Sequence, residues 1–186
     1  MVRVKASSTA TTQSPANETA LNDGNGCVAS LSPQTIVRLA RNEDVASIIE
    51  LDPIAKQDQG RRAFIANAVA AGQCWAAVGG VDAEDASALL GYGVLNQSFF
   101  EHDFIPLVMV KDSARRRGVA SAIMRMLESQ CQGGKLFTST NTSNLAMRRL
   151  LVQLGFIKSG QIENLDDQDP ELVFVKLRTS SGPTNT

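Results

Sequence analysis

The sequence has little of what metal sites, disulfide frameworks and membrane spans require. It contains one histidine and three cysteines. Cys27, Cys74 and Cys131 are too widely spaced to form the paired pattern of a zinc site. An odd number of scattered cysteines, without an apolar signal segment, indicates reduced thiols in a cytosolic setting. We therefore expect no metal site and a cytoplasmic location.

The chain also lacks a strong net charge and a long apolar run. Its 18 Lys and Arg against 19 Asp and Glu give a formal net charge of -1, so the chain as a whole has no basic surface for nucleic acid or for acidic membranes. No apolar run approaches the length of a membrane span. With 43% hydrophobic residues, the chain can bury one core. These observations predict one soluble domain that binds neither nucleic acid nor membrane.

The two ends of the chain differ in composition from its middle. Residues 1–33 consist largely of Ser, Thr, Ala, Asn and Gly, and they show neither a helical nor a strand period. We predict a disordered tail over 1–33, a folded domain over 34–178 and a disordered C-terminal tail over 179–186. The first residues carry Arg3 and Lys5 and no acidic group, so organelle targeting by this tail is the alternative to a cytoplasmic location.

The most informative segment is the basic stretch Arg115-Arg116-Arg117-Gly118-Val119-Ala120. It follows the apolar run 104–110, which is typical of a buried strand, and it precedes an apolar stripe at helical spacing. Gly118 lacks a Cβ, so a ligand can approach the backbone, and the first N–H groups of a helix have no intrahelical acceptor. These donors, the helix dipole and three arginines favour a phosphate or pyrophosphate. The alternative is a solvated basic turn that begins a helix.

A second motif lies downstream of this loop. Residues 135–141 predict a strand, and Asn144 begins a helical pattern that ends at Gly155-Phe156. The two segments resemble the hallmark segments of the GNAT superfamily of acyl-CoA-dependent N-acyltransferases. These are a Gln/Arg-x-x-Gly-x-Gly/Ala loop and an Asn-led helix that ends in Gly-Phe. Both occur in the expected order, and the resemblance covers residues 34 to 177.

The other patterns fit the fold that this resemblance implies. Strands are predicted at 35–40, 74–78, 89–95, 104–110, 135–141, 157–164 and 172–177. Helices are predicted after Asn42 or Asp44, after Gly60, from Val119 and from Asn144. The implied class is α/β (α+β), the GNAT fold, with a mixed central sheet of about seven strands flanked by about four helices. The sheet order itself comes from the resemblance and not from the patterns.

The resemblance implies an N-acetyltransferase. Such an enzyme moves an acetyl group from acetyl-CoA, its cosubstrate, to a primary amine on a small molecule or a protein by direct attack in a ternary complex. Two alternatives stay open: a catalytically silent acyl-CoA-binding or regulatory module, and an unrelated nucleotide-phosphate binder. The chain has no Gly-x-x-x-x-Gly-Lys-Ser/Thr motif, which argues against ATP as the ligand of such a binder. Exposed strand edges leave a homodimer open.

The resemblance also implies which residues hold acetyl-CoA. The backbone of residues 108–110 would pair with the pantetheine arm, and one N–H would polarise the thioester carbonyl. The pyrophosphate would lie on the amides of residues 116–120, with an arginine side chain neutralising its charge. Asn144 would touch the cofactor arm, or would act only as a helix N-cap. The expected cofactor-binding residues are Val108, Met109, Val110, Arg115, Arg116, Arg117, Gly118, Val119, Ala120 and Asn144.

The residue that protonates the leaving thiolate is not evident from the sequence. Many GNAT enzymes have a tyrosine seven residues after the asparagine, but Leu151 stands there. Tyr92, the one tyrosine of the chain, falls on an earlier predicted strand. Coenzyme A is acidic enough to leave without a dedicated acid. The other candidates are Ser139, Thr140, Asn141, Cys131 and water.

For the general base, the resemblance favours the segment Glu101-His102-Asp103 ahead of the cofactor-binding strand. Glu101 and His102 are the predicted catalytic residues, and Asp103 ranks after them. A histidine titrates in the range that a base needs. The structural alternatives are a solvated histidine and a charged turn.

The acceptor site is predicted from two further segments. The acidic stretch from Asp166 to Glu171 lies near the acceptor side in GNAT enzymes and could attract a cationic amine, or it could be a solvated turn closed by Pro170. Phe99 and Phe100 could line an apolar acceptor pocket or belong to the core.

Overall fold

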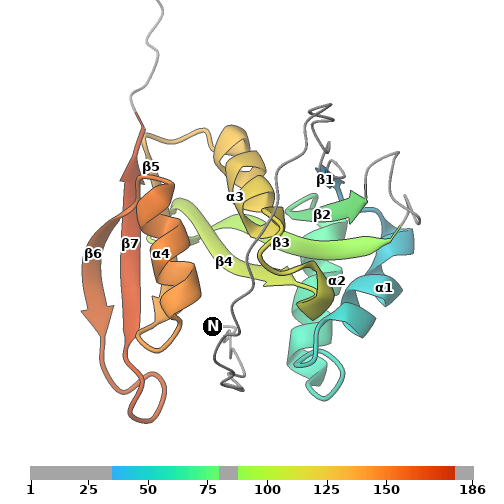
Figure 1. Ribbon diagram of the computed structural model, residues 1–186, viewed down its shortest axis with the longest axis horizontal. Coiled ribbons are helices and arrows are strands. Elements are labelled where there is room, and N and C mark those ends of the chain that lie inside the picture. Colours follow the sequence, from blue (N-terminus) through green and yellow to red (C-terminus); the bar gives the residue numbers. More distant parts are fainter. Residues whose placement is uncertain (1–34, 80–87, 179–186) are drawn as a thin grey trace, which may run out of the picture.

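The computed structural model describes residues 35–79 and 88–178, which fold into a mixed sheet with helices on both faces (Figure 1). The strands are β1 (Thr35–Leu39), β2 (Cys74–Gly79), β3 (Leu89–Phe99), β4 (His102–Val110), β5 (Lys135–Asn141), β6 (Ile157–Ile162) and β7 (Glu171–Leu177). The helices are α1 (Val45–Leu51), α2 (Gln59–Ala70), α3 (Val119–Gln130) and α4 (Leu145–Gln153), with 3-10 turns η1 (Asn42–Asp44) and η2 (Asp112–Ala114). The predicted tails, 1–33 and 179–186, and Cys27 lie outside the described residues.

The predicted α/β class, with seven strands and four helices, is confirmed. One local prediction needs correction, because the strands predicted at 89–95 and 104–110 extend toward each other, and β3 and β4 form a tight hairpin that includes His102 and Asp103. Phe99 pairs with His102, and only Phe100 and Glu101 form the turn. Their φ angles are 49° and 61°, as a two-residue hairpin turn requires. Asn-Gly is the usual sequence signal for such a turn, so Phe100-Glu101 does not predict it.

The strand order is β1-β2-β3-β4-β5-β7-β6, and β4 and β5 are parallel neighbours. Their pairing is short, because it joins only residues 103–105 to residues 136–138. Beyond Ile105, β4 continues to Val110 beside β3, while beyond Thr138, β5 continues to Asn141 beside β7. The two strands therefore part after Ile105 and Thr138, and we call this opening the β4–β5 split. Figure 1 shows β5, β6, β7 and α4 gathered on one side of α3, with β1, β2, α1 and α2 on the other.

The split has a local cause in β4. Val94 pairs with Leu107 and Asn96 pairs with Phe104, so β4 carries one residue more than β3 between the two pairs. This excess is a β-bulge, which bends the strand that contains it. Pro106, inside the bulge, has no N–H to donate to a neighbouring strand. The bulge and the proline therefore turn β4 away from β5 at the point where their pairing ends.

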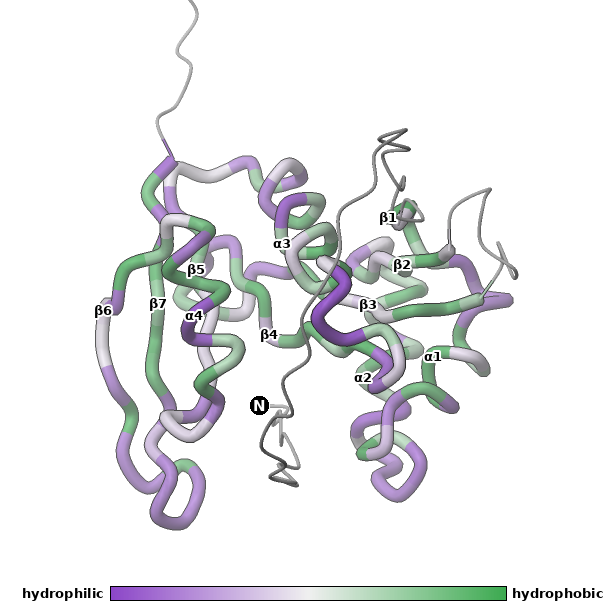
Figure 2. The backbone as a smooth tube through the Cα atoms, viewed as in Figure 1, coloured by the Kyte–Doolittle hydropathy of each residue, from purple (hydrophilic) through white to green (hydrophobic). Residues whose placement is uncertain are grey.

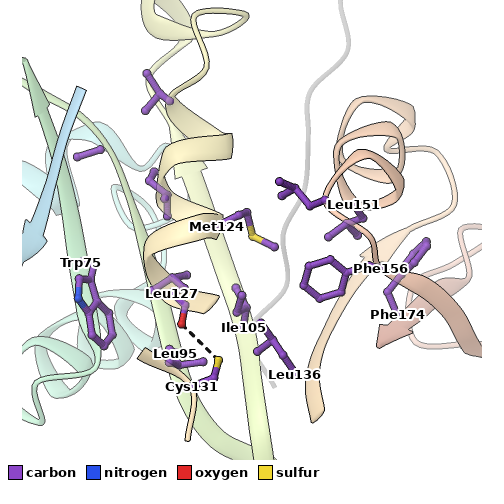
Figure 3. Close-up of a cluster of buried hydrophobic side chains, with 14 of the residues drawn as sticks. Trp75, Leu95, Ile105, Met124, Leu127, Cys131, Leu136, Leu151, Phe156 and Phe174 are labelled. Carbon is purple, nitrogen blue, oxygen red and sulfur yellow. Dashed lines mark hydrogen bonds between the residues drawn. The ribbon is translucent and has the colours of Figure 1, made fainter. Parts of the chain in front are cut away.

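Two hydrophobic clusters cover opposite faces of the sheet. In β2, Trp75 and Ala77 belong to one cluster while Ala76 belongs to the other, and successive side chains of a strand point to opposite faces. The first cluster joins α3 and α4 to the sheet through residues such as Leu127 and Leu151 (Figure 3). The second joins α1 and α2 to β2, β3 and β4. We call the two sides of the sheet the α3 face and the α1 face.

Glycines in β3 allow α3 to pack closely. A Cβ at Gly93 would stand 2.6 Å from Cγ2 of Ile123 and 2.9 Å from Cδ1 of Leu127. Both partner side chains are fully buried, so they have little room to move aside. The position of α3, and with it the start of the helix beside the basic loop, depends on this close contact.

A buried polar network anchors the segment between α1 and α2. Arg61 Nε and the hydroxyl of Tyr92 both donate to Oδ2 of Asp52, at 2.8 and 2.5 Å. Oδ1 of Asp52 accepts the backbone N–H groups of Ile54 and Ala55. Burial alone would raise the pKa of Asp52, but the bonds from Tyr92 and Arg61 outweigh it and hold that pKa below its ordinary value.

Candidate active site

The β4–β5 split leaves a row of backbone groups on β4 without a strand partner. Residues 107–110 pair with β3 on one side, and no described strand lies against their other side. The side chains of Val108 and Val110 pack on the α3 face, and Met109 packs on the α1 face. An extended ligand with amide groups can add to such an edge as a strand would. The predicted cofactor residues of β4 therefore line the split through their backbone.

The basic loop lies at the open end of the split, between β4 and α3. Arg115, Arg116, Arg117 and Gly118 are all exposed, and Figure 2 shows this connection as strongly hydrophilic. Gly118 is the N-cap residue of α3 with φ at 81°, and nothing lies within 4 Å of the position its Cβ would take. Arg115 also pairs with Asp112 at 2.7 Å. An open helix start beside three guanidinium groups fits a phosphate or pyrophosphate.

Asn144 lies on the other side of the split, at the start of α4. Its side chain accepts the N–H of Met147 at 3.2 Å, so it is the N-cap residue of this helix. A contact between Asn144 and a cofactor stays a prediction.

The acidic segment before β7 folds against the connection between β5 and α4. Asn141 donates to Oδ2 of Asp166 at 2.9 Å, and the hydroxyl of Ser143 donates to Oδ2 of Asp169 at 2.7 Å. The N–H of Thr142 donates to the carbonyl of Pro170. The segment is thus a fixed part of the β5 side of the split.

Two polar side chains lie beyond the last β4–β5 pair. Ser139 follows Thr138 in β5 and pairs with Val173, and it shares one face of the sheet with Glu171, the first residue of β7, which pairs with Asn141. Burial raises the pKa of Glu171, and the nearby carboxylates of Asp166 and Asp169 raise it further, whereas the bond from Ser139 opposes this rise. The sequence analysis placed Glu171 in an acidic turn, because no pattern in the sequence reveals the register that brings β5 beside β7.

The predicted catalytic pair lies in the hairpin, on the paired side of the split. Glu101 is a turn residue, His102 begins β4, and both side chains are exposed. The ring centroids of His102 and Phe137 are 5.4 Å apart, and those of Phe99 and Phe137 are 5.1 Å apart. Since Phe137 and Ser139 alternate with Thr138 along β5, they share one face of the sheet. The hairpin therefore adds aromatic side chains to the face that carries Ser139.

The remaining hairpin residues have other surroundings. Asp103 is buried, and its Oδ2 accepts the N–H groups of Gln132 and Gly133 at 3.0 and 2.8 Å. It thereby holds the turn between α3 and β5. Phe100 is 83% exposed at the tip of the hairpin, so of the two phenylalanines proposed for an acceptor pocket only Phe99 packs among other rings of the sheet.

Three positions considered for protonation of the leaving thiolate lie in the core. Leu151 is fully buried in the α3-face cluster. Tyr92 is fully buried, burial raises its pKa, and its hydroxyl is bonded to Asp52. Cys131 donates to the carbonyl of Leu127 at 3.3 Å, and burial raises the pKa of its thiol to about 12. None of these three side chains offers a proton at the split.

A groove of about 870 Å³ borders the open end of β4 on the α1 face. Its walls include Met109, Val110 and Arg115, with Ser47 and Glu50 of α1 opposite them. It touches the predicted cofactor residues but reaches neither Ser139 nor Glu171.

Residues 35–79 and 88–178 contain no group of three or more His, Cys, Asp or Glu arranged to bind a metal ion. No helix among them is long and apolar enough to cross a membrane.

Comparison with known proteins identifies relatives of the chain. Residues 42–156 match the acetyltransferase (GNAT) family. A GNAT-family acetyltransferase from Bacillus cereus is 33% identical with a TM-score of 0.69, and the match covers 78% of this chain and 99% of that chain. Comparison with curated protein sequences finds no match.

Two more distant solved structures share the fold. The yncA protein of Salmonella typhimurium, solved with its cofactor acetyl-CoA, is 15% identical with a TM-score of 0.62, over 82% of this chain and 98% of that chain. The ribosomal-protein-S18-alanine N-acetyltransferase of Escherichia coli is 13% identical with a TM-score of 0.63, over 82% and 99% of the two chains.

Proposed function

Because this chain belongs to the GNAT family of acetyltransferases, we propose that it moves the acetyl group of acetyl-CoA to a primary amine by direct attack in a ternary complex. The family makes the protein an acetyltransferase. The donor, the amine acceptor on a small molecule or a protein, and the single-step mechanism are the proposal. The observation that carries it is the β4–β5 split, which has an open strand edge on β4, a basic loop at the open end of that strand, and Ser139 and Glu171 on the β5 side.

The length of the split suits the extended arm of coenzyme A. From Ile105 to Val110, five residues of β4 span about 16 Å at about 3.3 Å per residue. The pantetheine arm is a narrow chain with two amide groups, so it can pair with this edge while the pyrophosphate rests at the start of α3. In this arrangement residues 108–110 hold the arm, and residues 115–120 hold the pyrophosphate. The acyl end then lies near Ile105 and Thr138.

The protein's own groups assist the transfer in two ways. When bound, acetyl-CoA supplies an activated acyl group. A backbone N–H of the open β4 edge polarises the acyl carbonyl and stabilises the negative charge that develops on its oxygen. The sheet fixes the donor against the acceptor, which removes much of the entropy cost of bringing them together. A thiol is acidic enough to leave as a thiolate, which agrees with the burial of Leu151 at the position of the usual tyrosine.

Calorimetry and thiol release test this proposal. Purified protein is titrated with acetyl-CoA, with ATP and NAD as control ligands, and thiol release is then followed with spermidine, a lysine peptide and a peptide with a free amino terminus. Binding together with amine-dependent release supports the proposal and names the acceptor class. Binding without release from any amine would favour the silent acyl-CoA-binding module, and tighter binding of ATP or NAD would contradict the acetyl-CoA assignment.

A further inference from the structure

Glu171 lies on the β5 side of the β4–β5 split, opposite Asn141 and three residues beyond the pair at which the split closes. Ile105 and Thr138 form the last pair of the two strands, and the hydroxyl of Thr138 donates to the carbonyl of Ile105 at 2.9 Å. Ser139 is the next residue of β5, and it lies on the same face of the sheet as Glu171, diagonally across from it. Ser139 therefore lies between Glu171 and the point where the strands part, on the face that Glu171 shares.

Ser139 and Glu171 face away from α3. In β7, Leu172 and Phe174 pack in the α3-face cluster, so Glu171 and Val173 point to the α1 face. Ser139 pairs with Val173 and shares that face. The basic loop leads into α3 on the other face. Acetyl-CoA held by the basic loop and an amine held by Glu171 would thus approach the split from opposite faces of the sheet, as a ternary complex requires.

The surroundings of Glu171 increase its affinity for a proton. The side chain is half-buried, and burial followed by the charges of Asp166 and Asp169 raises its pKa. The neighbouring strands place only neutral side chains in register with it, namely Asn141 on β5 and Ile162 on β6. The acidic loop also gives this side of the split a negative potential, which attracts an ammonium group.

We propose that Glu171 is the general base for the acceptor amine and that Ser139 is its positioning residue; this assignment rests on the function proposed above. The carboxylate takes one proton from the bound ammonium. The amine nitrogen then bonds to the acetyl carbon while the carbon–sulfur bond of acetyl-CoA breaks. The second proton of the amine passes through solvent to the leaving sulfur, and Glu171 returns its proton to solvent.

This assignment differs from the sequence-based one. His102 lies three residues before Ile105, which is about 10 Å along a strand, and it lies on the paired side of the split. Glu101 is one residue further away. Glu171 pairs with Asn141, which is also three residues from the closing pair but on the open side of the split, so the two assignments predict different effects of substitution.

The test measures thiol release by the full chain with acetyl-CoA and each amine probe between about pH 6 and about pH 9. Glu171→Gln should lower kcat by about 100-fold or more, because general base catalysis contributes about 100-fold to 10,000-fold. The affinity for acetyl-CoA, measured by calorimetry, should stay within about twofold, since the donor residues are untouched. Glu171→Asp, which keeps the charge on a shorter side chain, should give an intermediate kcat.

Ser139→Ala tests the positioning role. Loss of the serine bond removes a group that favours the ionised carboxylate, so the pKa of Glu171 should rise. In the plot of kcat against pH, the fall of kcat at acidic pH should therefore begin at higher pH. The maximal kcat at high pH should fall much less than in Glu171→Gln. Glu43→Gln is the control, because it removes one charge from an exposed residue outside the acidic segment and should leave kcat and its pH dependence unchanged.

Each remaining outcome counts against the assignment. Retention of kcat and of the pH profile in Glu171→Gln would overturn it. Loss of the fall of kcat at acidic pH in Glu101→Gln or His102→Gln, with Glu171→Gln active, would place the base in the hairpin. If the wild-type protein binds acetyl-CoA but releases no thiol with any amine, the proposed function fails first and the base assignment falls with it. Thermal melting of each variant separates lost activity from lost folding, and Glu171→Asp carries the test if Glu171→Gln unfolds.

Discussion

Substitution of Gly118 tests the phosphate site at the start of α3. The residue has φ at 81°, and no atom lies within 4 Å of the position of a Cβ. Any side chain placed there therefore meets backbone strain but no steric clash. This separates two effects, because Gly118→Ala introduces only the strain, whereas Gly118→Glu adds a negative charge beside the proposed pyrophosphate.

The two effects have different magnitudes and different readouts. A non-glycine residue in the left-handed region costs about 1–2 kcal/mol, so both variants should lose about 2–8 °C of melting temperature in a chain of this size. Two like charges about 4 Å apart repel by about 1 kcal/mol in bulk water and by about 4 kcal/mol near a protein surface. Gly118→Glu should therefore bind acetyl-CoA between about fivefold and about 1,000-fold more weakly than Gly118→Ala.

Calorimetric titration with acetyl-CoA measures this difference at two salt concentrations. The gap between the two variants should narrow at high salt, because the loop is exposed and salt screens exposed charges. Gly160→Glu is the matched control, since Gly160 lies in β6 with open space around it. Equal affinity of folded Gly118→Ala and Gly118→Glu would refute the phosphate site, even if both variants bound acetyl-CoA less tightly than the wild type.

Three further predictions concern stability. Tyr92→Phe should lower the free energy of unfolding in urea by about 1.5–3 kcal/mol, because it removes a hydrogen bond to a buried carboxylate; a loss below about 0.5 kcal/mol would contradict the network. The pKa of Asp52 is lowered in the folded state, so the ionised carboxylate stabilises the fold fully above the ordinary carboxyl pKa, and this stabilisation is lost as pH falls through the folded pKa. Tyr92→Phe removes one of the bonds that lower this pKa. Acid unfolding, followed by circular dichroism, should therefore begin at higher pH in Tyr92→Phe than in the wild type. Gly93→Ala should cost about 1–3 kcal/mol, because its Cβ would overlap Ile123, whereas Gly160→Ala, with no neighbour within 4 Å, should cost much less in the same urea titration.

The sequence predicts most of the element list because these elements follow hydrophobic periodicity. The helix from Val119 to Gln130 and the strand from Lys135 to Asn141 begin where the patterns place them. The basic loop was also evident, since its residue types are unusual in a turn between a buried strand and a helix. These features depend on residues close together in the chain.

The features that define the split could not be predicted, because they depend on register between distant segments. The bulge at Pro106 appears only when β4 is paired with β3. The contact of Ser139 with Glu171 requires β5 and β7 to be neighbours, although β6 lies between them in sequence. In the sequence, Glu171 stands before an apolar run and is therefore assigned to the end of a turn. Its place beside β5 becomes evident only from the strand pairing.

The split gives a physical reason why this chain can work without the tyrosine that many family members carry. Leu151 fills the core between α4 and the sheet, so α4 contributes packing at that position instead of a proton donor. The harder proton transfer is the one from the acceptor, because an ammonium group cannot attack until it has lost a proton, whereas a thiolate leaves readily. The carboxylate of Glu171, the proposed base on the face of the sheet opposite α3, meets that requirement. Acetyl transfer therefore depends more on a general base, the role proposed for Glu171, than on a general acid at the position of Leu151.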